Sequence, residues 1–154
     1  MSVENGASVI AIRPLEEQDR ERWNELWRGY LTFYETELPD EAYDLAWARL
    51  NDPNEPMFGL GAFVEGRLAG IAHCLYHRSF WTKAPYCYLQ DLFTDPEFRG
   101  RGVAKELIVR VYEVAAADGA ARVHWLTHET NTIAQSVYDG VAARSGFIQY
   151  RKIL

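Results

Sequence analysis

The segment from Tyr86 to Ala117 constrains the fold more tightly than any other part of the chain. Residues 86–94 are mostly apolar and rich in aromatic side chains, which is typical of a β-strand, and residues 95–97 have the turn sequence Asp-Pro-Glu. From residue 102 onward, apolar side chains recur at the spacing of one helix face. A strand that runs through a short turn into a helix is typical of strand–helix–strand crossovers, which pack helices against a sheet. The segment therefore predicts an α/β protein.

The remaining sequence supplies the other elements of one domain, which we expect to span residues 1–154. The expected strands are 8–13, 58–64, 67–77, 86–94, 123–127 and 147–154, and the expected helices are one between Glu16 and Pro39, then 41–51, 102–117 and 132–144. Gly146 stands where a glycine that ends a helix is expected. The order β-α-α-β-β-β-α-β-α-β predicts an α/β (α+β) fold with a mixed central sheet of about six to seven strands and helices on both faces.

The composition is that of a globular protein and excludes several classes of function. Hydrophobic residues make up 48% of the chain and charged residues 25%, which are ordinary values for a soluble domain. The net charge of −6 disfavours a nucleic-acid-binding surface, and no apolar stretch is long enough to cross a bilayer. Residues 1–11 lack the pattern of a signal peptide, and the two cysteines, Cys74 and Cys87, form no disulfide framework. We therefore expect a cytoplasmic protein without a nucleic-acid or membrane partner.

The run Arg99-Gly-Arg-Gly-Val-Ala104 stands at the start of the expected helix 102–117. Glycines let the backbone approach a ligand closely, and the free N–H groups and dipole of a helix N-terminus favour an anion such as a diphosphate. Arg99, Arg101 and Lys105 add positive charge around this point. The alternative is a tight turn with solvated arginines. The spacing of a P-loop is absent, and the dinucleotide-binding glycine pattern is incomplete.

The same run resembles the acetyl-CoA-binding motif of the GNAT superfamily of N-acetyltransferases. That motif is Arg/Gln-x-x-Gly-x-Gly/Ala, and Arg99, Gly102 and Ala104 stand at the matching positions. A second family pattern, Asn-x-x-Ala-x-x-x-Tyr followed by Gly-Phe, is matched by residues 131–138 and 146–147. The two patterns occur in the family's order and on the expected types of element.

The resemblance extends in element order from Ile10 to Leu154, and residues 88–102 are most similar to the diamine (polyamine) and histone/polyamine-like acetyltransferases. It implies an enzyme that transfers an acetyl group from acetyl-CoA directly to an amine, without a covalent enzyme intermediate. The cofactor contacts that it implies are Leu92, Phe93, Thr94, Arg99, Gly100, Arg101, Gly102, Val103, Ala104, Lys105, Asn131 and Ala134.

Tyr138 is the residue that the resemblance makes the general acid. A phenol with a pKa near 10 can hydrogen-bond or protonate a departing thiolate whose thiol has a pKa of about 8.5. The alternative is a helix tyrosine that packs against the sheet.

The general base is left open by the sequence. In diamine acetyltransferases a glutamate, proposed as the base, occupies the position of Gln90, and an amide cannot accept that proton. We expect Gln90 to orient a water molecule or the substrate. Asp91 is adjacent, but alternation along a strand predicts that it points to the other face of the sheet. Glu35 is a further candidate, and the alternative for it is an exposed helix carboxylate.

The expected acceptor is a small-molecule amine, polyamine-like or amino-acid-like, bound near Tyr30, Tyr34, Glu35 and Gln90. Tyr30 and Tyr34 also fit an aromatic stripe that packs in the core. Two other functions stay open: a protein acetyltransferase that acts on lysine side chains or N-termini, and a non-catalytic module that binds acetyl-CoA. The final strand, 147–154, could pair across a homodimer.

Histidines occur in two pairs with the same spacing, His73 with His77 and His124 with His128. On a helix this spacing could chelate zinc, but on strands it separates the side chains by about 13 Å. We therefore expect no metal site.

Overall fold

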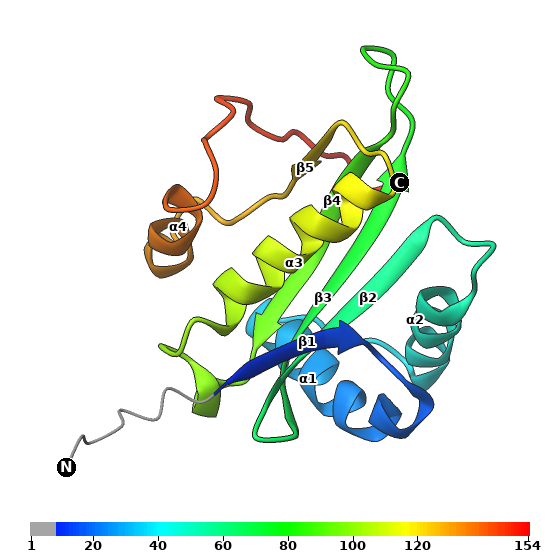
Figure 1. Cartoon of the computed structure of the whole chain (residues 1–154), viewed down its shortest axis with the longest axis vertical. Helices are drawn as coiled ribbons and strands as arrows, with labels where there is room; N and C mark the ends of the chain where they lie inside the picture. Colours follow the sequence, from blue (N-terminus) through cyan, green and yellow to red (C-terminus); the bar gives the residue numbers. More distant parts are fainter. Residues whose placement is uncertain (1–8) are drawn as a thin grey trace.

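The computed structural model describes residues 9–154, which form a mixed five-stranded sheet with helices on both of its faces (Figure 1). The strands are β1 Ile10–Pro14, β2 Met57–Val64, β3 Arg67–His77, β4 Tyr86–Thr94 and β5 Arg122–His124. The helices are α1 Arg20–Phe33, α2 Asp40–Asn51, α3 Val103–Ala117 and α4 Thr132–Asp139, with short 3₁₀ turns at Glu17–Asp19 and Pro96–Phe98. The strands lie in the order β1-β2-β3-β4-β5, in which β1 to β4 are antiparallel neighbours and β5 is parallel to β4. Within this described part of the chain, no helix is both long and apolar enough to span a membrane.

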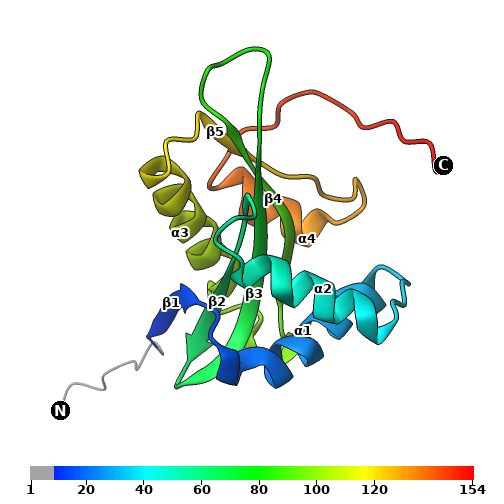
Figure 2. The same ribbon diagram turned by 90° about the vertical axis from the view of Figure 1, so that its right-hand side faces the viewer.

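Two apolar layers hold the helices against the sheet, one on each face (Figure 2). On one face, α3 packs through Leu107, Ile108 and Val111, which are completely buried. On the other face, α1 and α2 pack through Trp23 and Tyr43. A large apolar side chain buried in this way contributes about 1.5–3 kcal/mol. The mixed α/β fold with helices on both faces therefore agrees with the sequence prediction.

Gly70 in β3 lets the start of α3 lie close against the sheet. A Cβ atom at this position would stand 2.7 Å from Val103 Cγ1 and 3.1 Å from the Phe93 carbonyl oxygen. A side chain there would push α3 and β4 away from β3, because protein interiors leave no spare volume. The close approach thus fixes where the turn between β4 and α3 lies.

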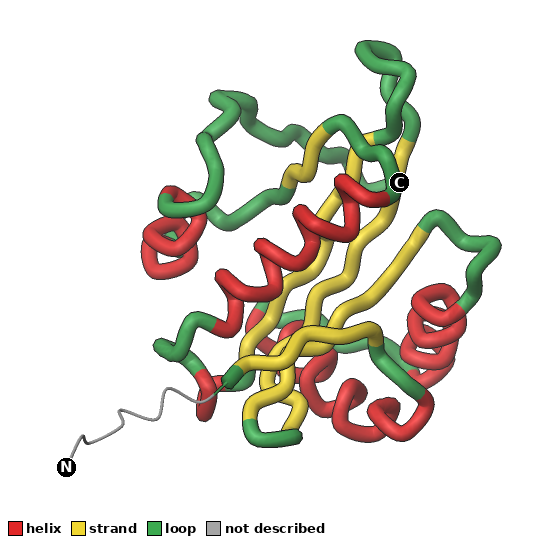
Figure 3. Tube along the Cα trace, viewed as in Figure 1, coloured by secondary structure: helices red, strands yellow, loops and turns green. Residues whose placement is uncertain are grey.

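The predicted final strand, 147–154, is wrong, and the sheet accordingly has five strands instead of six to seven. The chain after α4 has no helix or strand (Figure 3), and Phe147, Tyr150 and Ile153 are exposed. A strand needs a hydrogen-bonded neighbour, and this segment pairs with none in residues 9–154. The apolar pattern alone was therefore not sufficient to form a strand.

Other boundaries differ by smaller amounts. The predicted helix 132–144 ends at Asp139, and Gly146 has a φ of 84° but lies in the coil beyond that helix. The predicted strand 123–127 is the short β5, and the predicted first strand runs to Pro14, which pairs with Leu60. Its predicted start at Ser8 lies outside the described residues.

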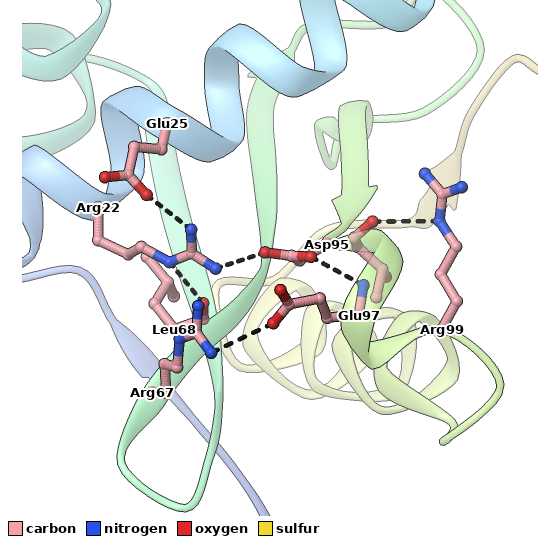
Figure 4. Close-up of polar contacts among 8 residues, drawn as sticks. Arg22, Glu25, Arg67, Leu68, Asp95, Glu97 and Arg99 are labelled. Carbon is pink, nitrogen blue, oxygen red and sulfur yellow. Dashed lines mark hydrogen bonds and ion pairs between the residues drawn. The ribbon is translucent and has the colours of Figure 1, made fainter.

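An ion-pair network joins α1 to the turn between β4 and α3 (Figure 4). Arg22 donates to Asp95 Oδ2 at 2.5 Å, to Glu25 at 2.7 Å and to the Leu68 carbonyl oxygen at 3.2 Å. The other Asp95 oxygen accepts from the Glu97 backbone N–H at 2.9 Å. Burial raises the pKa of Asp95, but the Glu97 N–H and the Arg22 guanidinium outweigh burial and hold this pKa below its ordinary value.

Asp95→Ala is expected to lower the free energy of unfolding by about 2 kcal/mol, because it removes the buried carboxylate partner of Arg22, which keeps only Glu25, and removes the cap of the 3₁₀ turn. Urea denaturation at neutral pH measures the difference. Because the pKa of Asp95 is lowered in the folded state, its contribution is present above the ordinary value of 3.8 and is lost as the pH falls below it. Glu97→Ala is the control, since it breaks only an exposed pair with Arg67 and should cost less than about 1 kcal/mol. Equal losses from the two substitutions would contradict the prediction.

Candidate active site

Strand β4 is paired on both sides over only part of its length. It pairs with β3 from Tyr86 to Thr94, but with β5 only from Tyr86 to Tyr88. Within residues 9–154, the edge of Leu89–Thr94 that faces away from β3 therefore has no strand partner, and the chain after β5 turns away toward α4 (Figure 1). Such an edge offers backbone N–H and C=O groups to an extended ligand. The predicted contacts Leu92, Phe93 and Thr94 lie on this open edge and are half-buried.

The glycine loop continues from the end of β4 and leads into α3. Gly100 and Gly102 have φ values of 77° and 83°, and a Cβ atom added to either would meet nothing within 4 Å. Gly102 is the N-cap of α3, and no side chain caps this end of the helix. The first-turn N–H groups therefore face open space, with the predicted residues Arg99, Arg101 and Lys105 exposed around them. A helix end of this kind binds a diphosphate through its N–H groups and its dipole.

Helix α4 packs against α3 and carries Tyr138. Asn131 caps the helix, because its side-chain oxygen accepts from the Ala134 backbone N–H at 3.2 Å. The two predicted contacts Asn131 and Ala134 are thus joined to each other, and both are half-buried. The Tyr138 ring packs edge-on against Trp125, with 5.4 Å between ring centroids, and Tyr112 donates to the Val141 carbonyl oxygen at 2.9 Å. These contacts hold α4 against α3.

Four tyrosines from three parts of the chain gather near this edge: Tyr30 and Tyr34 at the end of α1, Tyr88 in β4 and Tyr138 in α4. Burial raises the pKa of all four phenols, and the Asp91 carboxylate raises the pKa of Tyr30, Tyr34 and Tyr88 further. Tyr34 in turn adds to the rise in the pKa of Tyr138 through an electrostatic interaction. All four therefore stay protonated at neutral pH and can donate hydrogen bonds. Helices on opposite faces of the sheet thus meet at one site.

A β-bulge at Gln90 overturns the expectation that Gln90 and Asp91 point to opposite faces of the sheet. Asp91 stands opposite His73, whereas Leu89 stands opposite the next residue, Cys74, so that Gln90 is an extra residue in β4. A bulge breaks the alternation of side chains along the strand. Asp91 is buried, Gln90 is exposed, and both line the same cavity.

That cavity has a volume of about 270 Å³ and lies between α2 and strands β2 to β4. The lining residues are Trp27, Ala42, Leu45, Ala46, Arg49, Leu50, Met57, His73, Cys74, Leu75, Gln90 and Asp91. Most of this lining is apolar, with one carboxylate, one amide, one guanidinium and one imidazole. The buried Trp27 N–H has no hydrogen-bond partner in residues 9–154.

A buried chain of polar side chains reaches Asp91 from α1, and two of its members could not be recognised as site residues in the sequence. The Trp23 indole N–H donates to His73 Nε2 at 2.9 Å, and His73 Nδ1 lies 3.1 Å from Asp91 Oδ2. All three side chains are buried. The one signal in the sequence was a histidine within the otherwise apolar run 68–75.

Other predicted candidates lie apart from this chain of contacts. Glu35 is exposed, with a φ of 55°, and no hydrogen bond or ion pair joins it to Asp91 within the described residues. His73 and His77 are separated, and His77 Nε2 instead lies 3.1 Å from His124 Nε2. In residues 9–154 no three or more metal-binding side chains are grouped together.

Similarity to known proteins identifies the family to which this chain belongs. The sequence profile of the acetyltransferase (GNAT) family matches residues 21–141. The chain is 34% identical to the D-amino-acid N-acetyltransferase HPA3 of Saccharomyces cerevisiae, over 93% of this chain and 90% of that protein. It is 32% identical to a thialysine N-epsilon-acetyltransferase of Caenorhabditis elegans, over 57% of this chain and 54% of that protein. Among solved structures, the aminoglycoside N-acetyltransferase AAC(6')-Iy in complex with CoA superposes with a TM-score of 0.80, at 26% identity, over 98% of this chain and 99% of that one.

The fold, the open edge of β4 and the glycine loop, together with these similarities, define the chain as an acetyl-CoA-dependent N-acetyltransferase. The chain belongs to the acetyltransferase (GNAT) family, whose members transfer an acetyl group from acetyl-CoA to an amine.

Gly102→Glu is expected to abolish binding of acetyl-CoA, because it puts a carboxylate at the helix N-terminus where the diphosphate is expected. Calorimetry with CoA measures the affinity. The matched control is Gly66→Glu in the β2–β3 turn, where φ is 76° and the surrounding space is equally open. Both substitutions impose the left-handed strain of about 1–2 kcal/mol, but only the first lies at the loop. A folded Gly102→Glu protein with unchanged affinity would show that the diphosphate binds elsewhere.

Proposed function

We propose that this enzyme acetylates the amino group of a small amino-acid-like amine. The observation that carries the proposal is the composition of the 270 Å³ cavity, which contains Asp91 for an ammonium group and Arg49 for a carboxylate in a mostly apolar lining. A polyamine would instead bring a second ammonium group toward Arg49, and like charges repel. The yeast relative, whose name describes action on D-amino acids, adds support.

The predicted cofactor residues fit acetyl-CoA under this proposal. The open backbone of Leu92–Thr94 would pair with the pantetheine arm, and a backbone N–H there would donate a hydrogen bond to the thioester oxygen as this oxygen gains negative charge. Residues 99–105 would hold the diphosphate, because the glycines leave room and the helix N–H groups are free. Asn131 and Ala134 would border the arm from the start of α4.

Tyr138 would serve as the general acid. Burial raises the pKa of this phenol, and Tyr34 adds to the rise, so that the phenol stays protonated. It can therefore donate to the sulfur as the carbon–sulfur bond breaks. The packing of its ring against Trp125 fixes the direction of that donation. Tyr30, Tyr34 and Gln90 would line the approach of the acceptor, and the exposed Glu35 would lie at its rim.

A matched set of amines tests the acceptor. We expect acetyl-CoA turnover with D- or L-phenylalanine to exceed turnover with phenethylamine, which lacks the carboxylate, by at least about tenfold in kcat/KM, the effect of one good charged hydrogen bond. Arg49→Met should remove that preference. Arg78→Met, which changes an exposed arginine outside the cavity, should leave it intact.

The same assay separates the alternatives. Equal kcat/KM values for phenylalanine and phenethylamine would sink the amino-acid assignment, and turnover restricted to spermidine or thialysine would favour a polyamine-like acceptor. Turnover with a lysine-containing peptide alone would point to a protein acetyltransferase. CoA binding without turnover of any amine would point to a non-catalytic module.

Tyr138→Phe is expected to lower kcat by about 100-fold, within the range for removal of a general acid, with little change in the KM for acetyl-CoA. Steady-state kinetics measures both constants, and the melting temperature is measured alongside. Tyr112→Phe is the control: it removes a phenol that only ties α3 to α4, so it should lower stability and spare kcat. A near-normal kcat in Tyr138→Phe would leave Tyr138 as a packing residue.

A further inference from the structure

Asp91 differs from the other buried aspartates in residues 9–154 because it has no positively charged partner. Asp19 and Asp95 are 8% and 9% exposed, and each binds an arginine guanidinium, at 2.7 and 2.5 Å. Asp91 is 8% exposed, and its contact with a basic side chain is the one with His73 at 3.1 Å. Burying a carboxylate without a compensating charge is costly.

The hydrogen-bond chain requires that His73 be neutral where it meets Asp91. An indole N–H can only donate, so His73 Nε2 must accept from Trp23 and cannot carry a proton. The proton of the neutral ring is then on Nδ1, which donates to Asp91 Oδ2. Trp23 and His73 therefore orient the carboxylate without neutralising its charge.

A ligand could supply a positive charge to Asp91 from the cavity that this residue lines. Trp27, Arg49, His73 and Gln90 line this cavity together with Asp91, and the other lining residues are apolar. The Trp27 N–H is a buried donor without a partner in the described residues. The phenols whose pKa this carboxylate raises, Tyr30 and Tyr34 at the end of α1 and Tyr88 of β4, are neutral. A carboxylate held in one orientation beside empty space and an unused donor fits a ligand that carries both an ammonium group and an acceptor.

We propose that Asp91 binds the ammonium group of the acceptor and accepts its proton, and that Trp23 and His73 are positioning residues for this carboxylate. The proposal rests on the acetyl transfer proposed above and supplies the base that the amide of Gln90 cannot provide. An alkylamine with a pKa near 10.4 must lose its proton before it can attack.

Acetyl transfer from acetyl-CoA to the ammonium form of the acceptor conserves protons and electrons. One ammonium proton passes to Asp91 Oδ1, the freed nitrogen lone pair forms the bond to the acetyl carbon, and the carbon–sulfur bond breaks with its electron pair on sulfur. Tyr138 donates its proton to that sulfur and recovers one from the new amide nitrogen, and Asp91 releases its proton to solvent. An ammonium ion and acetyl-CoA thus yield an amide, CoA thiol and one proton.

Binding of two matched probes tests the cation site without turnover. Phenethylamine is cationic and 2-phenylethanol is its neutral counterpart, and calorimetry gives the dissociation constant of each. We expect the wild-type enzyme to bind the amine at least 10-fold more tightly than the alcohol and Asp91→Asn to lose this preference. Asp19→Asn, the same change at an equally buried aspartate paired with Arg13, should keep it.

Kinetics and melting then separate a functional carboxylate from a structural one. Asp91→Asn should lower kcat/KM for phenylalanine at least 100-fold, leave the KM for acetyl-CoA unchanged, and keep or raise the melting temperature, because it removes a buried charge without a partner. Asp19→Asn should lower the melting temperature and spare kcat/KM. Wild-type kcat/KM and an unchanged probe preference in Asp91→Asn would overturn the proposal.

The positioning role has its own readout. Nitrogen NMR of the histidines should find the His73 proton on Nδ1 in the wild-type enzyme, and a proton on Nε2 would overturn the chain. Trp23→Phe should mix the two tautomers and lower kcat about 10-fold. Trp47→Phe alters a ring whose centroid lies 5.1 Å from that of Trp23, and it should change neither the His73 tautomer nor kcat. Equal losses of kcat in the two variants would show that Trp23 acts only as a packing residue.

These tests separate the two proposals. An amine preference that depends on Asp91, in an enzyme that acetylates no amino acid, supports the cation site and rejects the proposed acceptor. Acetylation of phenylalanine that survives Asp91→Asn supports the acceptor and rejects Asp91 as the base.

Discussion

The incomplete pairing of β4 is the constraint on which the rest of the site depends. β4 has β3 on one side throughout, but β5 on the other only at Tyr86–Tyr88. The glycine loop continues from the open end, α4 follows the strand that diverges from it, and the tyrosines of α1 approach it from the other face. If β5 paired along the whole of β4, backbone groups would be used up in the sheet and the two faces would be separated. Tyr34 and Tyr138, which come from opposite faces, could not then act on each other electrostatically.

Buried carboxylates have two different roles in this fold. Asp95 holds α1 to the turn before α3, and its charge is matched by Arg22. Asp91 lies in the same helix–sheet layer, but it is oriented by a neutral imidazole and faces a cavity. The first arrangement stabilises the turn that leads into the glycine loop, and the second leaves a charge for a ligand to match. Functional sites often retain such uncompensated groups at a cost in stability.

The elements with strong local patterns could be predicted from the sequence. The bounds of β3 and β4 were correct, and Gly102 was correctly placed at the start of α3, because periodicity and glycine position determine them. The final strand and the direction of Asp91 could not be predicted, because each depends on a partner elsewhere in the chain. A strand at 147–154 needs a neighbour that the pattern does not contain, and the bulge at Gln90 is defined only against the register of β3. The role of His73 was hidden for the same reason, since it depends on Trp23 packing over the sheet.

The two helices on the cavity side of the sheet, α1 and α2, have separate roles. Trp23, which orients His73 and Asp91, belongs to α1, whereas Leu45, Ala46 and Arg49 of α2 form much of the cavity wall. Substitutions on α2 can therefore reshape the cavity while the carboxylate stays in place. A lineage built on this scaffold can drift from one amine to another by altering a single helix, without rebuilding its proton chemistry each time.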